Sequence, residues 1–237
     1  MKVALAHDHL FQIGGAEHIL REFSSIYPSA PIHTLIHDTR TKLDFNQSPI
    51  VTSYLQKVPG SVRFFKYLLP LMPAAWERFN FSGYDVVLSS SSAFVKGIIT
   101  SPQTVHISYC HSPTRYLWSD SLSYIDELRL PRVAKLYLHS LLSRLRLWDQ
   151  AAANRVDYFI ANSTYIAERI KKYYHRGSVV IYPPVEINKF QISAEIEKFF
   201  LVVSRLRPYK KVDLVIKAFN ALKLPLVIIG GGEEIER

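Results

Sequence analysis

The sequence predicts an α/β fold built on a parallel sheet. Three observations predict it: short apolar runs rich in β-branched residues alternate with longer helical patterns, a glycine pair follows the first run, and polar or proline-containing segments follow several others. Strands of a parallel sheet are buried on both faces, so they read as continuous apolar runs separated by crossover helices. We therefore expect helices on both faces of one sheet.

The first predicted strand is the apolar run 3–6, which leads through a polar loop to Gly14 and Gly15. Apolar residues then recur at helical spacing from 16 to 26. This order of strand, glycine turn and helix places the turn at the carboxyl edge of the sheet, where open α/β folds bind their ligands.

The following elements are predicted in chain order from the same patterns. Strands are expected at 31–36, 85–88, 105–110, 156–161 and 179–182. The run 85–88 leads into four serines, and the run 179–182 is stopped by two prolines. A helix over 164–174 is expected to begin at Asn162 and Ser163, because short polar side chains cap the first free amides of a helix.

A domain boundary is predicted near residue 190, because hydrophobic density falls and charge rises from 188 to 198. The first domain is expected over 1–190. The second, over 191–237, contains a strand at 199–204, a helix at 211–222 and a strand at 224–229. Such a unit is too small to cover its own sheet. The rest of a domain, the first domain or another chain is expected to cover it.

Composition limits the class of protein. Hydrophobic residues make up 48% of the 237 residues, enough for a packed core. No apolar run has the length of a membrane span, and the N-terminal apolar run is too short for a signal peptide, so we expect a cytoplasmic protein. The single cysteine, Cys110, excludes an intrachain disulfide. A net charge of +9 indicates attraction to phosphate on nucleic acid, nucleotide sugar or anionic lipid.

The glycine turn is the first candidate binding site, because Gly14 and Gly15 allow a phosphate or sugar to approach the backbone at a helix N-terminus. A tight turn without a ligand explains the two glycines equally well, and the absence of a full G-x-G-x-x-G pattern disfavours a nicotinamide cofactor. Before the turn, His7, Asp8 and His9 suggest either a metal site or a polar loop beside a sugar pocket. Side chains alternate along a strand end, so His7 and His9 share one face while Asp8 points to the other. No third ligand is evident, and the polar loop is therefore favoured.

Two loops after strands carry further candidates. In the loop 109–118, His111 is suited to bond a sugar hydroxyl and Arg115 to meet a phosphate. In the loop 204–211, Arg205 and Lys210 combine a planar fork with a point charge, which suits a diphosphate. A structural histidine and a solvated basic loop are the alternative interpretations. The position of both loops between strand and helix favours binding.

Basic and apolar residues also interleave at 129–150 and 63–69. Such segments lie on anionic bilayers, or they are a pair of helices that pack on the sheet with their charged ends in water, and the second interpretation is at least as well supported. Nucleic-acid binding is not expected, because aromatic and basic residues do not alternate as in a recognised module.

Taken in order, these stretches resemble the retaining GT-B glycosyltransferases of family 4, most closely their bacterial mannosyltransferase-like branch. The matching segments are 6–8 (AHD), 14–17 (GGAE), 84–87 (YDVV), 109–113 (YCHSP), 115–118 (RYLW), 152–157 (AANRVD), 162–163 (NS), 182–185 (YPPV) and 204–206 (SRL) with Lys210. The resemblance implies a Rossmann-like GT-B N-terminal domain with a parallel sheet, plus the first strand-helix-strand of a second Rossmann-like domain.

The resemblance also implies a reaction. A hexose, with mannose from GDP-mannose as the expected case, passes from a nucleotide sugar to a lipid-linked or polysaccharide acceptor with retention and without a metal ion or other cofactor. His111 is implied as the catalytic contact to the transferred sugar. Gly14, Gly15, Arg205 and Lys210 are implied to bind the donor phosphates, and Asp8, Glu17 and Arg115 to contact acceptor or sugar. Peripheral attachment to the inner face of the membrane is also expected.

One departure from the family affects activity. The family's second domain continues into a glutamate-marked segment that grips the nucleotide sugar, and Glu233, Glu234 and Glu236 do not reproduce its spacing. We therefore expect a chain truncated in its second domain, so that residues 1–237 alone transfer little or no sugar. The alternative is a non-catalytic acceptor- or membrane-binding half of a split glycosyltransferase, completed by a second chain.

Overall fold

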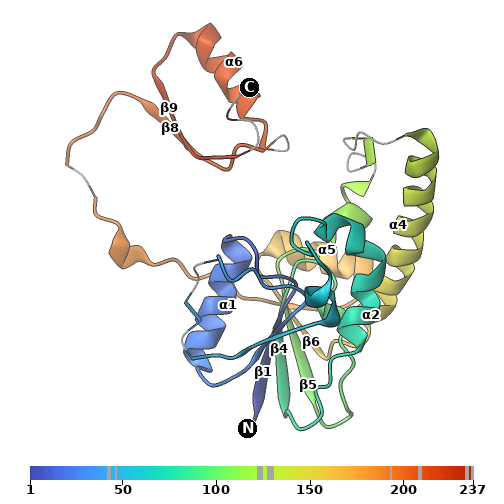
Figure 1. Ribbon diagram of the computed structural model, residues 1–237. Helices are drawn as coiled ribbons and strands as arrows, with labels where there is room; N and C mark the ends of the chain where they lie inside the picture. The colour runs from blue at the N-terminus through green and yellow to red at the C-terminus, as the bar shows by residue number, and fades with distance from the viewer. Residues whose placement is uncertain are drawn as a thin grey trace. The chain divides into compact units, whose positions relative to one another are not determined.

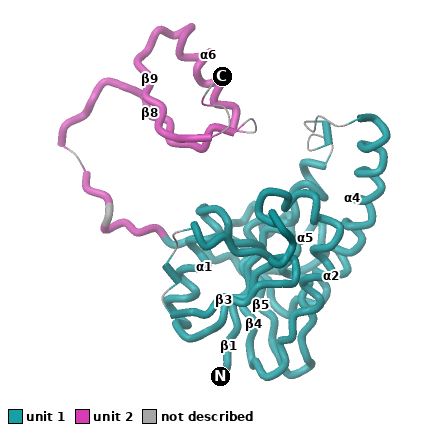
Figure 2. Tube along the Cα trace, viewed as in Figure 1, with its two compact units in different colours: residues 1–184 teal, residues 185–237 magenta. Residues whose placement is uncertain are grey.

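The computed structural model describes residues 1–41, 44–45, 47–121, 125–126, 131–192, 194–207, 210–232 and 235. The chain divides into two compact units, 1–184 and 185–237 (Figure 2). The boundary expected at residue 190 falls shortly after this division. Each unit is described by itself.

Unit 1 is built on a seven-stranded parallel sheet with the strand order β3-β2-β1-β4-β5-β6-β7 (Figure 1). The strands are β1 (Val3–His7), β2 (Ile32–Thr34), β3 (Ile50–Thr52), β4 (Val86–Ser91), β5 (Val105–Cys110), β6 (Tyr158–Ala161) and β7 (Val179–Val180). The predicted α/β class and parallel sheet are confirmed.

Helices cover both faces of this sheet: α1 (Gly15–Ile26) lies on one side, and α2 (Met72–Glu77) and α4 (Arg132–Ala153) lie on the other (Figure 1). Successive side chains of β1 point alternately to the two faces of the sheet, as the two-residue period of a strand requires. Leu5 packs in a cluster with Leu20 of α1, whereas Ala4 packs in a cluster with Trp76 of α2 and Leu142 of α4. Helix α5 (Thr164–Tyr174) contributes Ile166 and Ile170 to a third cluster beside β6.

Several predicted bounds need correction. Strand β4 continues through Ser91, so three of the four serines expected after the strand belong to it. Their buried hydroxyls are tolerated because Ser89 is hydrogen-bonded to His106 and Ser90 to His111. Strand β3, the 3-10 helix η1 (Tyr54–Lys57) and helix α2 were not predicted. The 3-10 helix η2 (Phe65–Leu71) overlaps the stretch 63–69, for which a helix was one of the two interpretations. Helix α4 begins at Arg132, and residue 129 of the predicted stretch lies outside the described residues.

Unit 2 contains the predicted strand, helix and strand: β8 (Phe200–Val203), α6 (Val212–Leu222) and β9 (Leu226–Ile229). The two strands pair in parallel. Residues 208–209 of the predicted basic loop, and Glu233, Glu234 and Glu236, lie outside the described residues. Within the described part of the chain, no helix combines the length and apolar character needed to cross a bilayer.

Two ionisable side chains of β5 are held neutral in the core of unit 1. Burial raises the pKa of the Cys110 thiol to about 12. Burial also lowers the pKa of His106 to about 3, against an opposing pull from the Asp157 carboxylate. His106 is fully buried, and its Nε2 lies 2.9 Å from the Ser89 hydroxyl oxygen.

His106 should make the stability of unit 1 depend on pH. The unfolded chain protonates this imidazole below its ordinary pKa of 6.5, whereas the folded chain keeps it neutral down to about pH 3. Between these values the unfolded state binds more protons, so the free energy of unfolding falls as the pH falls, by about 1.4 kcal/mol per pH unit for this residue. The contribution is fully present above pH 6.5.

Urea unfolding at a series of pH values, followed by tryptophan fluorescence, measures this dependence, since all three tryptophans of the chain belong to unit 1. The variant His106→Gln should show a shallower slope between pH 6 and about pH 4 than the unmodified chain. Equal slopes would contradict the assignment.

Candidate functional site

Polar side chains from three strands and one helix meet at the carboxyl edge of the sheet in unit 1. Strand β1 ends at His7, β4 ends one residue beyond Ser90, and β5 ends just before His111. His7 and Ser90 are register partners across β1 and β4. The N-terminus of α1, at Gly14 and Gly15, lies beside them, because the Ser90 hydroxyl is 3.4 Å from the Ala16 carbonyl oxygen.

The glycine turn leaves the start of α1 open. Gly14 is the N-cap in extended conformation, with no side-chain cap hydrogen bond. Gly15 is exposed, and a Cβ added there would meet no atom within 4 Å. The first amides of a helix have no partner within it and carry the positive end of its dipole. This end of α1 therefore has both the room and the polarity for an anionic or hydroxylated ligand.

His111 is held in place by both its backbone and its ring. Its N–H donates to the Ser91 carbonyl at 2.8 Å, and its own carbonyl accepts from Asn162 Nδ2 at 3.2 Å. Its Nε2 lies 2.8 Å from the Ser90 hydroxyl oxygen. Burial, with a smaller contribution from the nearby His7, lowers the pKa of His111 to about 4 against the opposing charges of Asp8 and Glu17. At neutral pH His111 is thus an uncharged imidazole that acts through hydrogen bonds.

Glu17 faces inward, toward the end of β1. Its carboxylate oxygen is 3.6 Å from His7 Nε2, and both side chains are buried. Burial raises the pKa of Glu17, but the hydrogen bond and charge of His7 outweigh burial, so the pKa is lowered overall. A contact of Glu17 with acceptor or sugar stays a prediction. The pairing with His7 was not foreseen.

Asp8 anchors a loop. Its two carboxylate oxygens accept four backbone N–H bonds of 2.7 to 2.8 Å, from Ser92, Ala93, Phe94 and Val95. The side chain is 2% exposed. These bonds fix the segment that leaves β4 against the end of β1. A ligand contact for Asp8 stays a prediction, and its structural role was missed because the partners lie more than 80 residues away.

A second buried carboxylate holds the loop after β5. Asp149 of α4 pairs with Lys96 and accepts hydrogen bonds of 2.8 Å from Thr114, Trp118 and Tyr174. Lys96 also donates to Thr114 at 3.2 Å. Lys96 and Asp149 are at most 1% exposed, so each charge depends on the other. Neither residue was predicted as functional from the sequence, and the one signal for Asp149 is a charged residue within an apolar helical pattern.

Arg115 lies in this loop with its side chain half exposed and paired with Asp120 at 2.6 Å. The Asp120 carboxylate thus binds the guanidinium that was expected to bind a ligand phosphate, and a phosphate contact of Arg115 stays a prediction. Arg205 and Lys210 belong to unit 2, where they lie in the loop between β8 and α6, and both are exposed. Their expected binding of a diphosphate also stays a prediction.

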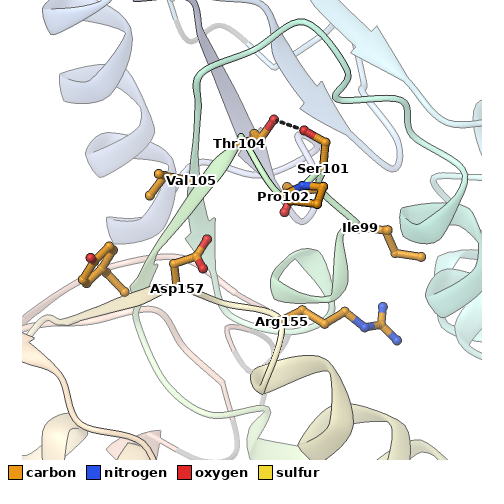
Figure 3. Close-up of a pocket in the computed structure, with 9 residues that line it drawn as sticks. Ile99, Ser101, Pro102, Thr104, Val105, Arg155 and Asp157 are labelled. Atoms are coloured by element: carbon orange, nitrogen blue, oxygen red, sulfur yellow. Dashed lines mark hydrogen bonds between the residues drawn. The ribbon is translucent and has the colours of Figure 1, made fainter.

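A pocket of about 490 Å³ lies at the opposite edge of the sheet (Figure 3). Its lining comes from the amino ends of β5 and β6, and the Ser101 and Thr104 hydroxyls in it bond each other at 2.9 Å. Arg155 in the lining is already paired with Glu77. We place the functional site at the carboxyl edge instead, where the open helix end and His111 lie. Among the described residues, no three His, Cys, Asp or Glu side chains are grouped to hold a metal.

Comparison with known proteins identifies the family. Residues 13–189, well over half of the chain, match the sequence model of Glycosyltransferase Family 4. The chain belongs to glycosyltransferase family 4. The matched segment contains Gly14, Gly15, Glu17, His111 and Arg115 of this family 4 chain. No curated protein matches it.

Solved structures similar to the family 4 chain include Anabaena Alr3699/HepE. The complex of that protein with UDP superposes with a TM-score of 0.61 at 14% identity, over 100% of this chain and 62% of the HepE chain. The complex with UDP-glucose gives a TM-score of 0.56 at 14% identity, over 98% of this chain and 69% of the other. At this identity the likeness supports the GT-B-like fold alone, and the family 4 chain spans less than two thirds of the first HepE structure.

Replacing Asp8 by Asn should destabilise unit 1 by about 3 kcal/mol, because the amide keeps one acceptor oxygen and turns a donor toward two of the four N–H groups. Urea unfolding followed by tryptophan fluorescence measures the loss. The matched control is Asp85→Asn, since Asp85 is 62% exposed at the other end of β4. Equal losses in the two variants would show that the four bonds to Asp8 contribute little.

Proposed function

We propose that this family 4 chain takes part in transfer of mannose from GDP-mannose to a lipid-linked or saccharide acceptor with retention of configuration. The observation that carries the proposal is the meeting of an open helix N-terminus at Gly15 with an uncharged, anchored imidazole at His111. Ser90 touches both features, lying 2.8 Å from His111 Nε2 and 3.4 Å from the carbonyl of Ala16.

The chemistry of the proposed reaction suits these groups. The bond between the sugar C1 and the diphosphate oxygen breaks, an acceptor hydroxyl oxygen bonds C1 on the same face, and the hydroxyl proton leaves with GDP. Negative charge grows on the diphosphate, so the free amides at the start of α1 would stabilise it. A neutral His111 would orient a sugar hydroxyl without placing a charge beside the reacting carbon.

Transfer is tested with the full gene product and radiolabelled GDP-mannose, with UDP-glucose as the competing donor. The expected product is a mannosylated acceptor with the anomeric configuration of the donor. Preference for UDP-glucose would overturn the choice of sugar, and an inverted linkage would overturn retention. Binding of acceptor without transfer from any donor would favour a non-catalytic acceptor-binding role.

The variant Gly15→Ala should separate ligand binding from folding. Apart from its chain neighbours and the backbone of α1, a methyl group at this position meets no protein atom within 4 Å, so the thermal midpoint of unit 1 should be unchanged or slightly raised. The same methyl group would occupy ligand space, so KM for donor or acceptor should rise by about tenfold or more. Gly177→Ala is the control, because its Cβ also meets nothing within 4 Å but lies away from the site. Equal KM values for the two variants would place the ligand elsewhere.

Attachment to the inner face of the membrane is part of the proposal. The outer face of α4 exposes Val133, Leu136, Tyr137 and Leu147 by 68 to 80%, and Arg132, His139 and Arg144 are also exposed on this helix. A second exposed apolar set surrounds η2: Phe64, Tyr67 and Leu71, with Arg63 and Lys66. Apolar side chains flanked by cations are the features that bind an anionic bilayer surface.

Vesicle flotation tests this attachment. The chain should float with equimolar phosphatidylglycerol and phosphatidylcholine and remain unbound to phosphatidylcholine alone. The double variant Leu136→Glu/Tyr137→Glu should lower the partition coefficient by about tenfold or more, through lost apolar burial and added negative charge. The control Tyr158→Glu alters a side chain of similar exposure at the amino end of β6. Unchanged flotation of the double variant would exclude α4 as the contact.

A further inference from the structure

We propose that His7 and Ser90 form a hydrogen-bond relay to His111, with the Glu17 carboxylate beside His7, that keeps the His111 proton on Nδ1 and makes His7 and Ser90 positioning residues for His111. The relay itself follows from the geometry of unit 1. Its consequence for sugar transfer rests on the role proposed above for His111.

The sheet brings the relay together from distant parts of the chain. Ser90 pairs in register with His7 on β1 and with Tyr109 on β5, two residues before His111. Side chains two residues apart on a strand share a face, so His7, Ser90 and His111 all point to the face that α1 covers. Helix α1 adds Glu17 in its first turn.

The contacts form a continuous series. His7 Nε2 lies 3.6 Å from the Glu17 carboxylate, and His7 Nδ1 lies 3.1 Å from the Ser90 hydroxyl and 3.2 Å from the Ser90 carbonyl oxygen. The Ser90 hydroxyl then lies 2.8 Å from His111 Nε2. His7, Glu17 and Ser90 are each at most 2% exposed, so water does not compete for these bonds.

The chemistry of each group decides where the protons lie. A carbonyl oxygen only accepts, so His7 Nδ1 carries a hydrogen that it donates toward Ser90. With Nδ1 of His7 as donor, the Ser90 oxygen accepts from it and directs its own single proton elsewhere.

Two acceptors compete for the proton of the Ser90 hydroxyl. His111 Nε2 is 2.8 Å away, whereas the Ala16 carbonyl is 3.4 Å away, near the limit for a hydrogen bond. The shorter distance shows that the Ser90 hydroxyl donates its proton to His111 Nε2, which is therefore an acceptor without a hydrogen of its own. A neutral imidazole carries one hydrogen, so the hydrogen of His111 lies on Nδ1. His111 therefore offers a ligand a donor, and the ligand must present an accepting oxygen, such as a sugar hydroxyl or a phosphoryl oxygen.

The opposite face of the same strand supplies a matched control. Ser89 is equally buried, and its hydroxyl lies 2.9 Å from Nε2 of His106. Ser89→Ala thus removes a serine hydroxyl bonded to a histidine, one residue away, without touching the relay. Ser90→Thr keeps the hydroxyl and serves as the conservative variant.

The tautomer is read from long-range ¹H–¹⁵N spectra of histidine-labelled chain, with the His111 signals assigned by their loss in His111→Asn. In the unmodified chain His111 should show a protonated Nδ1 and a bare Nε2. Ser90→Ala should produce a mixed or reversed signature, whereas Ser90→Thr and Ser89→Ala should keep the original one. A protonated Nε2 in the unmodified chain overturns the relay, even where Ser90→Ala does not fold. An unchanged signature in Ser90→Ala also overturns it.

Kinetics of the full gene product separate the relay from the proposed function. Ser90→Ala should lower kcat by about tenfold, the worth of one hydrogen bond, with partial recovery in Ser90→Thr and no loss in Ser89→Ala. The expected tautomer shift with unchanged kcat would support the relay and overturn the role of His111 in transfer. An unshifted tautomer with lowered kcat would overturn the relay and leave the proposed function standing.

Discussion

The arrangement of unit 1 at its functional edge depends on the buried carboxylate of Asp8. Four backbone amides of the segment leaving β4 converge on it, so the ends of β1 and β4 cannot separate without breaking charge-assisted bonds. The next residue along that segment is Lys96, whose ammonium group is paired with Asp149 of α4. Asp149 in turn holds the loop after β5 and the end of α5 through Thr114 and Tyr174. The loops at this edge are thus held by buried carboxylates, which leaves the carboxyl ends of the strands as the proposed place for a ligand.

Where local signals are strong, the sequence predicted the fold closely. Strand β5 and helix α5 have the predicted bounds, because a β-branched run between polar segments defines the strand and the Ser163 side chain caps the helix by accepting from the Ile166 amide at 3.3 Å. Strand β3 escaped prediction because it is three residues long and exists through parallel pairing with β2. Its stability is a tertiary effect, and a three-residue run carries no periodicity of its own.

The candidate site was predictable in part for the same reason. The glycine turn and His111 stand directly at strand ends, where parallel-sheet geometry gathers binding groups, so their sequence position was informative. The roles of Asp8 and Glu17 were less so. A ligand contact was predicted for both and stays a prediction, whereas the bonds of Asp8 to backbone amides and the contact of Glu17 with His7 were not predicted. Their partners come from segments that no local sequence pattern connects to them. Whether each carboxylate points into the protein or toward solvent is decided by the free-energy cost of burying a charge without a partner.

The buried Cys110 gives the chain a practical property. With its pKa raised to about 12 by burial, the thiol stays protonated at physiological pH, and only the thiolate reacts with alkylating reagents or oxidants. The chain contains no other cysteine. A single cysteine introduced on the surface would therefore be labelled selectively without removing the native one, so that a fluorophore or spin label could report ligand binding at the carboxyl edge of unit 1.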